Sequence, residues 1–140
     1  MDIKDVVDST VRKYKTRNPY ELSDLLHIQI SRCELGAIRG YYLKKYRIKQ
    51  IILNHNLNYA DEKFVLSHEL GHAIMHPGVN TPFLKENTYL STNKYEIEAN
   101  TFAAELLIPD SIILENPGMT KNQIARLTGY DEKIMKYKSI

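Results

Sequence analysis

One predicted helix, residues 61–76, carries two histidines and a glutamate in the spacing His68-Glu69-Leu70-Gly71-His72. Acidic residues fill its first turn, and Pro77 is expected to end it. Residues four apart share one face of a helix, so the rings of His68 and His72 point the same way. Two such imidazoles form half of a tetrahedral zinc site, and Glu69 can act on a water there without being a ligand.

The same helix is predicted to be buried, because it has no continuous polar face. Five residues with three fixed can occur by chance, and two histidines on a helix are usually polar surface. Buried imidazoles and a buried carboxylate need partners, however, and a metal ion would serve all three. Gly71 costs about 1 kcal/mol relative to alanine within a helix, which predicts close approach of a substrate or a strand. Asn58 or Asp61 is expected to cap the helix. Its apolar residues are Phe64, Val65, Leu66, Leu70, Ala73, Ile74 and Met75.

A second helix, residues 94–108, is predicted to supply a third ligand. Glu96 and Asn100 lie on one face of it, and Asn100 could accept a hydrogen bond from a ligand histidine. Glu98 lies about 200° around the helix from Glu96, so only one of the two can face the metal. The position of Asn100 favours Glu96, and Glu98 remains the alternative. Glu105 shares the side of Glu98, and we expect that side to face solvent.

These two blocks resemble the ImmA/IrrE metallopeptidases. The resemblance rests on the motif at residues 68–72 and on the block at residues 96–109, and it spans about residues 19–109. It implies a cytoplasmic gluzincin-type zinc endopeptidase, and members of that family cleave helix-turn-helix repressors of phages, mobile elements or stress regulons. Asn100 stands where gluzincins often have aspartate. The roles implied for this chain are zinc ligands His68, His72 and Glu96, general base Glu69, and outer-shell partner Asn100.

The expected fold is α+β and zincin-like: a small antiparallel sheet packed on the active-site helix and the second ligand-bearing helix, with short terminal helices. A length of 140 residues predicts a single metallopeptidase domain. Its expected parts are an N-terminal helix (1–18), a catalytic core (19–109) and a C-terminal helical segment (110–140). The expected elements before the motif are helices 3–14 and 20–26, a strand 27–35 with a possible bulge, and a hairpin of strands 41–45 and 47–53. The loop 78–93 is expected to be a lid or a specificity wall.

The C-terminal segment allows a second reading as a DNA-binding element. Thr120 and Gln123 have the spacing of a capping box, and two short helices follow, divided by Gly129. They resemble half of a helix-turn-helix, although a helical hairpin that closes the core is the simpler interpretation. The net charge of only +2 argues against direct nucleic-acid binding. Basic side chains available for phosphates are Lys121, Arg126, Lys133, Lys136 and Lys138.

Composition excludes several classes of protein. Cys33 is the only cysteine, so no internal disulfide forms; we expect it to be a buried small hydrophobe. The charged N-terminus does not resemble a signal peptide, and no apolar run approaches the length of a membrane span. We therefore expect a cytoplasmic enzyme without a membrane partner.

His76 is expected to interact with carbonyls at the helix end. The alternatives to an active zinc peptidase are a catalytically inactive zinc-containing binding module and a DNA-associated regulator.

Overall fold

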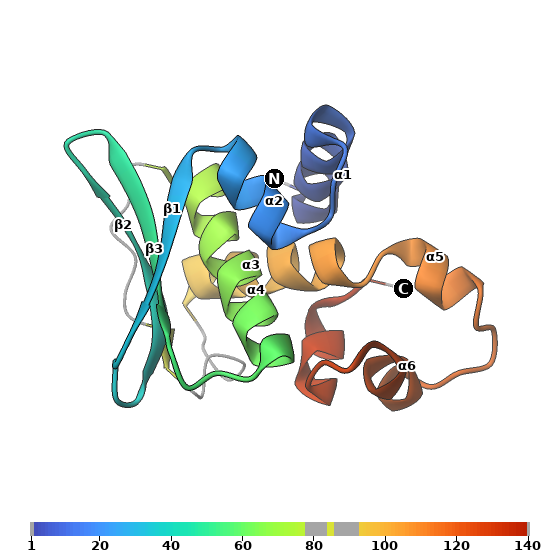
Figure 1. Cartoon of the computed structure of the whole chain (residues 1–140). Helices are drawn as coiled ribbons and strands as arrows, with labels where there is room; N and C mark the ends of the chain where they lie inside the picture. Colours follow the sequence, from blue (N-terminus) through green and yellow to red (C-terminus); the bar gives the residue numbers. More distant parts are fainter. Residues whose placement is uncertain (1, 78–83, 86–92, 140) are drawn as a thin grey trace.

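The computed structural model describes residues 2–77, 84–85 and 93–139. It is an α+β fold in which a mixed sheet lies on one side of helix α3 and helix α4 lies on another (Figure 1). Helices α1 and α2 cover one end, and the C-terminal elements pack at the far end of α4. The elements are α1 (Ile3–Tyr14), α2 (Pro19–Leu25), β1 (Ile28–Cys33), β2 (Ile38–Lys45), β3 (Ile48–Asn54), α3 (Tyr59–Met75), β4 (Leu84–Lys85), α4 (Lys94–Leu107), α5 (Asp110–Leu114), α6 (Lys121–Thr128) and the 3₁₀ helix η2 (Glu132–Tyr137).

The strand order in the sheet is β1-β3-β2-β4. Strands β2 and β3 form the predicted antiparallel hairpin, but β1 joins the outer edge of β3 and runs parallel to it. The sheet is therefore mixed rather than wholly antiparallel, while the α+β class and the zincin-like packing are confirmed. The side-chain amide of Asn54 fixes the connection between β1 and β2, because it donates to the carbonyls of Gly36 and Ile38 at 2.9 Å each. The register of β1 is unbroken, and the irregularity lies in β2 between Ile38 and Gly40.

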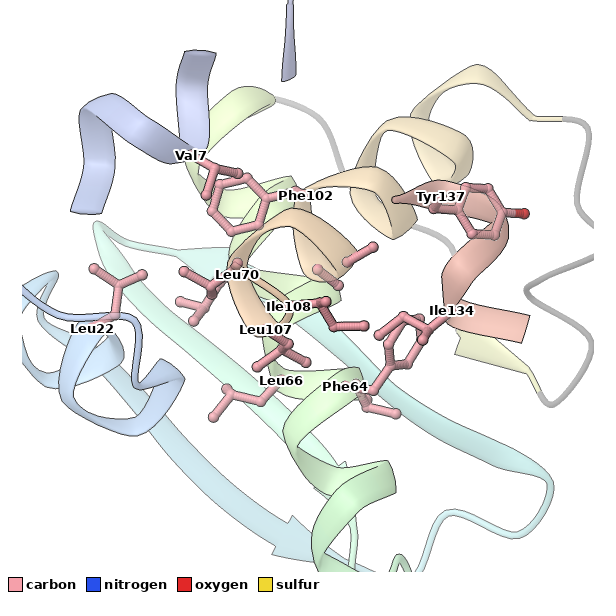
Figure 2. Packing of buried hydrophobic residues seen from close by; sticks show 14 of the residues in the cluster. Val7, Leu22, Phe64, Leu66, Leu70, Phe102, Leu107, Ile108, Ile134 and Tyr137 are labelled. Atoms are coloured by element: carbon pink, nitrogen blue, oxygen red, sulfur yellow. The ribbon is translucent and has the colours of Figure 1, made fainter. Parts of the chain in front are cut away.

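The core is centred on α3, which is buried on nearly all sides, as its apolar sequence predicts. Leu66, Leu70 and Phe102 are among its largest fully buried side chains (Figure 2). The side chain of Asn58 caps α3 by accepting from the amide of Asp61. The neighbour that approaches Gly71 is Phe102 of α4, so the expectation of a strand or substrate at this glycine was wrong.

The C-terminal elements close the core. Ile134 and Met135 of η2 are buried, and η2 packs against both α4 and α6. This arrangement matches the helical hairpin that closes the core. The capping box of Thr120 and Gln123 is present at the start of α6, and Gly129 ends that helix in the left-handed conformation.

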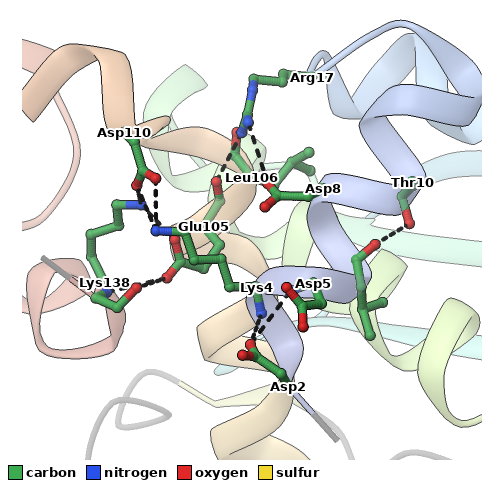
Figure 3. A network of polar contacts seen from close by, with 12 residues as sticks. Asp2, Lys4, Asp5, Asp8, Thr10, Arg17, Glu105, Leu106, Asp110 and Lys138 are labelled. Carbon is green, nitrogen blue, oxygen red and sulfur yellow. Dashed lines mark hydrogen bonds and ion pairs between the residues drawn. The ribbon is translucent and has the colours of Figure 1, made fainter. Parts of the chain in front are cut away.

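Three expectations about individual side chains were wrong. Glu105 does not face solvent: it is 3% exposed, and its carboxylate accepts from Lys138 and Ser139 (Figure 3). Lys138 is 4% exposed and is therefore not available for phosphates. Cys33 is exposed, because it lies at the end of edge strand β1. Among the described residues, no helix combines the length and the apolar character that a membrane crossing requires.

Candidate metal centre

Helices α3 and α4 bring three ligand-type side chains to one point. His68 and His72 project from the same face of α3, and Glu96 comes from the first turn of α4. The exposed fractions of their residues are 0%, 1% and 7%, so solvent hardly reaches them. One ligand atom from each lies within 4.8 Å of the others. The three residues predicted as ligands are thus gathered in space.

The distances within this cluster fit a single metal ion. His68 Nε2 lies 3.1 Å from Glu96 Oε2, His72 Nε2 lies 2.7 Å from Glu96 Oε1, and the two Nε2 atoms are 3.2 Å apart. Ligand atoms placed tetrahedrally around zinc at their usual bond lengths lie about 3.3 Å from one another. Two imidazole nitrogens and a carboxylate oxygen are also a donor set typical of zinc peptidases.

Asn100 orients one of the histidines. Its Oδ1 lies 2.7 Å from His68 Nδ1, and both residues are fully buried. Since an amide oxygen can only accept, His68 Nδ1 donates, and this bond directs Nε2 toward Glu96 and His72. His72 Nδ1, by contrast, is buried without a hydrogen-bond partner among the residues that the structure describes.

Glu69 lies beside the cluster but not in it. Its side chain is fully buried, and neither carboxylate oxygen has a hydrogen-bond partner within the described residues. Burial raises the pKa of Glu69 to about 8, against the lowering effect of His68. A buried carboxyl group with no partner is costly, so this one calls for a neighbouring cation or a polar ligand.

The cluster itself is charged. Burial alone would raise the pKa of Glu96, but its bonds to His68 and His72 outweigh burial and lower that pKa to about 2. Burial lowers the pKa of His72, whereas Glu96 and Glu69 overcome the same effect at His68 and raise its pKa. An ionised carboxylate beside two imidazole nitrogens is a donor set into which a divalent cation fits.

The alternative ligand Glu98 belongs to a different contact. Its Oε1 lies 3.2 Å from His76 Nε2, and the ring of Tyr95 packs edge-on against His76 with 4.6 Å between centroids. The structure therefore brings Glu96, and not Glu98, to the two histidines. The His76–Glu98 pair was missed from sequence; the available signal was that His76 extends the face of His68 and His72 by one more turn.

The loop expected to be a lid or specificity wall lies almost wholly outside the described residues. Within 78–93, the structure describes only strand β4, which pairs with β2, and Asn93, whose side chain caps α4.

Comparison with known proteins gives three matches. The model of a peptidase family described as the IrrE N-terminal-like domain matches residues 24–138. The chain is 45% identical, over 99% of its length and 89% of the relative's, to "Uncharacterized immunity region protein 2" of Bacillus phage phi105. It is 31% identical, over 97% of its length and 83% of the relative's, to "Metallopeptidase ImmA" of Bacillus subtilis (strain 168). All three matches cover the sheet and the metal cluster, and the two relatives also extend over the N-terminal helices that precede the family match.

Proposed function

Since this chain belongs to the ImmA/IrrE family of metallopeptidases, we propose that it is a zinc-dependent endopeptidase with a helix-turn-helix repressor as its substrate. The observation that carries the proposal is the buried carboxyl group of Glu69, which has no hydrogen-bond partner among the described residues and lies beside three converging ligand atoms. A purely structural metal site closes its ligand set and has no use for such a group. A hydrolytic site does, because it needs a base next to the metal.

The proposed roles follow from the positions of the side chains. His68, His72 and Glu96 would hold zinc, which when bound supplies the Lewis acidity that polarises a scissile carbonyl and acidifies water. Glu69 accepts the proton of the attacking water and then delivers it to the leaving amine. The raised pKa of Glu69 suits the second of these transfers, because a weakly acidic carboxyl group can hold a proton near neutral pH.

The substrate class rests on the relatives. One relative carries an immunity region in its name, and the other is named a metallopeptidase, ImmA. The repressor itself is proposed from the resemblance to the ImmA/IrrE family. The helix-turn-helix repressor encoded nearest to the gene for this chain is therefore the first substrate to test. Fold and family alone do not define a substrate, so the test must include the cleavage itself.

The experiment combines a cleavage assay with metal analysis. Wild type, Glu69→Gln, Glu96→Gln and Glu98→Gln are purified, their zinc content is measured, and each is incubated with the neighbouring repressor with and without chelator. We expect wild type to cleave only without chelator. Glu69→Gln should keep zinc and lose cleavage, because it retains the ligands but not the base. Glu96→Gln should lose both.

Glu98→Gln is the matched control, since it removes a carboxylate of the same helix that lies outside the cluster. It should retain zinc and cleavage. Cleavage by Glu69→Gln would refute the role of the base. Zinc-loaded wild type that cleaves no repressor would refute the proposed substrate, and if it hydrolyses no peptide at all, the inactive binding module replaces the enzyme.

A further inference from the structure

The turn between β2 and β3 carries a dense group of cations that are not part of the metal centre. Within residues 44–49, which we call the ribbon tip, four of six side chains are basic: Lys44, Lys45, Arg47 and Lys49. All but Lys49, which is half-buried, are exposed. Figure 1 shows this turn at the upper left, projecting at the end of the sheet beyond the helices.

The ribbon tip accounts for the positive charge of the whole chain. The chain has 19 basic and 17 acidic residues, so without the four cations of the tip the remainder would be acidic. Strands β2 and β3 contain no acidic residue. None of the ion pairs within the described part of the chain involves a cation of the tip. The small net charge of the whole chain, +2, is therefore compatible with one strongly basic region at the ribbon tip.

The residues of the ribbon tip are also unfavourable for the hairpin that they form. Lys44 and Lys49 are directly opposite partners in the β2–β3 ladder, and like charges at such positions destabilise a hairpin. Tyr46 and Arg47 occupy the two turn positions with φ of +52° and +66°, where glycine or asparagine is favoured. Departures of this kind from local preference are typical of a functional surface.

Two apolar side chains accompany the cations. Tyr46 is 86% exposed and Ile48 is 51% exposed, and the Nζ atom of Lys45 lies over the Tyr46 ring, 5.5 Å from its centroid. Side chains of a strand alternate between its two faces, so Lys44 and Lys49 lie on one face and Lys45 lies with Ile48 on the other. The ribbon thus presents positive charge on both faces and at its turn.

From this arrangement we propose that the ribbon tip is a docking surface for duplex DNA. Beyond Lys49, which also pairs with Ile28 of β1, the hairpin continues as a two-stranded ribbon. Such a ribbon fits the width of the major groove, and Lys44 and Lys45, on its opposite faces, can meet the phosphates of the two groove walls. Tyr46 and Ile48 at the end of the ribbon can contact base edges, including the methyl group of thymine. An acidic protein surface would engage one face of the ribbon only and would leave the cations of the other face unpaired.

This surface is additional to the metal centre and does not depend on peptidase activity. If the substrate is a repressor bound to its operator, the ribbon tip would hold the enzyme on the same DNA. That consequence rests on the proposed function, whereas DNA binding by the tip can be tested without any substrate.

The test measures binding of the full chain to a fluorescent 20-base-pair duplex of mixed sequence by anisotropy, at several salt concentrations. Four phosphate contacts predict a loss of affinity of about 100-fold between 50 and 200 mM salt. The variant Lys44→Gln/Lys49→Gln should weaken binding by about 10- to 100-fold at 100 mM salt and lower the slope of log K against log salt by about two. The matched control Lys121→Gln/Lys133→Gln removes the same charge from the exposed C-terminal surface and should bind like wild type.

A second measurement guards against misfolding of the variants. Because Lys44 and Lys49 repel each other, Lys49→Glu should have a melting temperature equal to or above that of wild type. It changes the charge by as much as the double variant does, so it should weaken DNA binding by a similar factor of about 10 to 100. The proposal is overturned if the tip variant binds as wild type does or if the control loses as much affinity. It is also overturned if a polyglutamate peptide displaces the protein more effectively than duplex DNA, or if single-stranded DNA binds more tightly than the duplex.

Discussion

The side chain of Phe102 lies so close to Gly71 that a Cβ built on the glycine would meet Phe102 Cβ at 3.0 Å and Cγ at 3.1 Å. This contact packs α4 against α3 at the residue that immediately precedes His72. The absence of a side chain at Gly71 therefore sets how closely the two helices approach. Because the histidines are on α3 and Glu96 is on α4, the same contact sets the size of the metal cluster.

Gly71→Ala should destabilise the protein and weaken metal binding together. Alanine favours a helix by about 1 kcal/mol over glycine, but overpacking a fixed core contact costs about 1–3 kcal/mol. The opposing atom is the Cβ of Phe102, which moves only with the backbone of α4. We expect a net loss of about 1 kcal/mol in urea denaturation, and a lower zinc affinity because the ligands move apart.

Ser67→Ala is the control on the same helix. Ser67 is fully buried, and its hydroxyl has no hydrogen-bond partner among the described residues. Removing a buried hydroxyl that has no partner is neutral or stabilising, and alanine also favours the helix. We expect unchanged zinc affinity and equal or greater stability. If Ser67→Ala lowers zinc affinity as much as Gly71→Ala does, the role assigned to the helix–helix contact is wrong.

Asn100 should control zinc affinity through His68, which it contacts at 2.7 Å. Asn100→Leu removes the acceptor for the Nδ1 proton, and losses of outer-shell partners of this kind typically cost 10- to 100-fold in metal affinity. Asn100→Asp keeps an acceptor oxygen and adds negative charge, so it should bind zinc at least as tightly as wild type. Competition with a chromophoric chelator measures both affinities. Equal affinity in Asn100→Leu and wild type would rule out the orienting role.

Helical periodicity predicted most of what could be known about this site before the structure. Residues four apart on α3, and again on α4, define faces with fixed geometry, so His68 with His72 and Glu96 with Asn100 followed from spacing. The structure brings these four together. The start of α3 at Asn58 and the capping box of α6 likewise depend on residues close in sequence.

Contacts between distant segments could not be predicted in the same way. The parallel pairing of β1 with β3 depends on which sheet edge is free, and the approach to Gly71 depends on how α4 crosses α3. Glu105 shares a side of α4 with Glu98, which predicts that it faces solvent. Position on a helix does not show, however, which distant segment packs against that side. Its partner Lys138 is 33 residues away and arrives only when the C-terminal segment packs.

The ion pair of Glu105 and Lys138 should be essential for attaching the C-terminal segment. Both side chains are nearly fully buried, and removing one partner of a buried pair typically costs about 3–5 kcal/mol because the other charge is left unpaired. Lys138→Met should therefore destabilise the protein strongly in urea denaturation. The double variant Glu105→Leu/Lys138→Met should recover much of that loss, because it leaves no buried charge alone. Equal instability of the single and double variants would show that packing, and not charge, holds the segment.

Asp110 should make stability depend on pH in the acid range. Hydrogen bonds from Lys138 and Lys4 lower the pKa of Asp110 to about 2 (Figure 3). A carboxyl group whose pKa is lower in the folded state stabilises the fold while it is ionised, so its contribution is complete above about pH 5 and is lost as pH falls toward 2. The side chain is half exposed, so solvent and salt reduce the size of the effect.

The measurement compares the free energy of unfolding of wild type and Asp110→Asn between pH 7 and pH 2.5. The difference should be constant above about pH 5 and should shrink toward zero as wild-type Asp110 becomes protonated. Glu132→Gln, an exposed carboxylate of η2 outside the described ion pairs, is the control and should follow wild type throughout. A difference between Asp110→Asn and wild type that persists unchanged at pH 2.5 would mean that the asparagine perturbs packing, and that Lys4 and Lys138 do not stabilise the ionised form of Asp110.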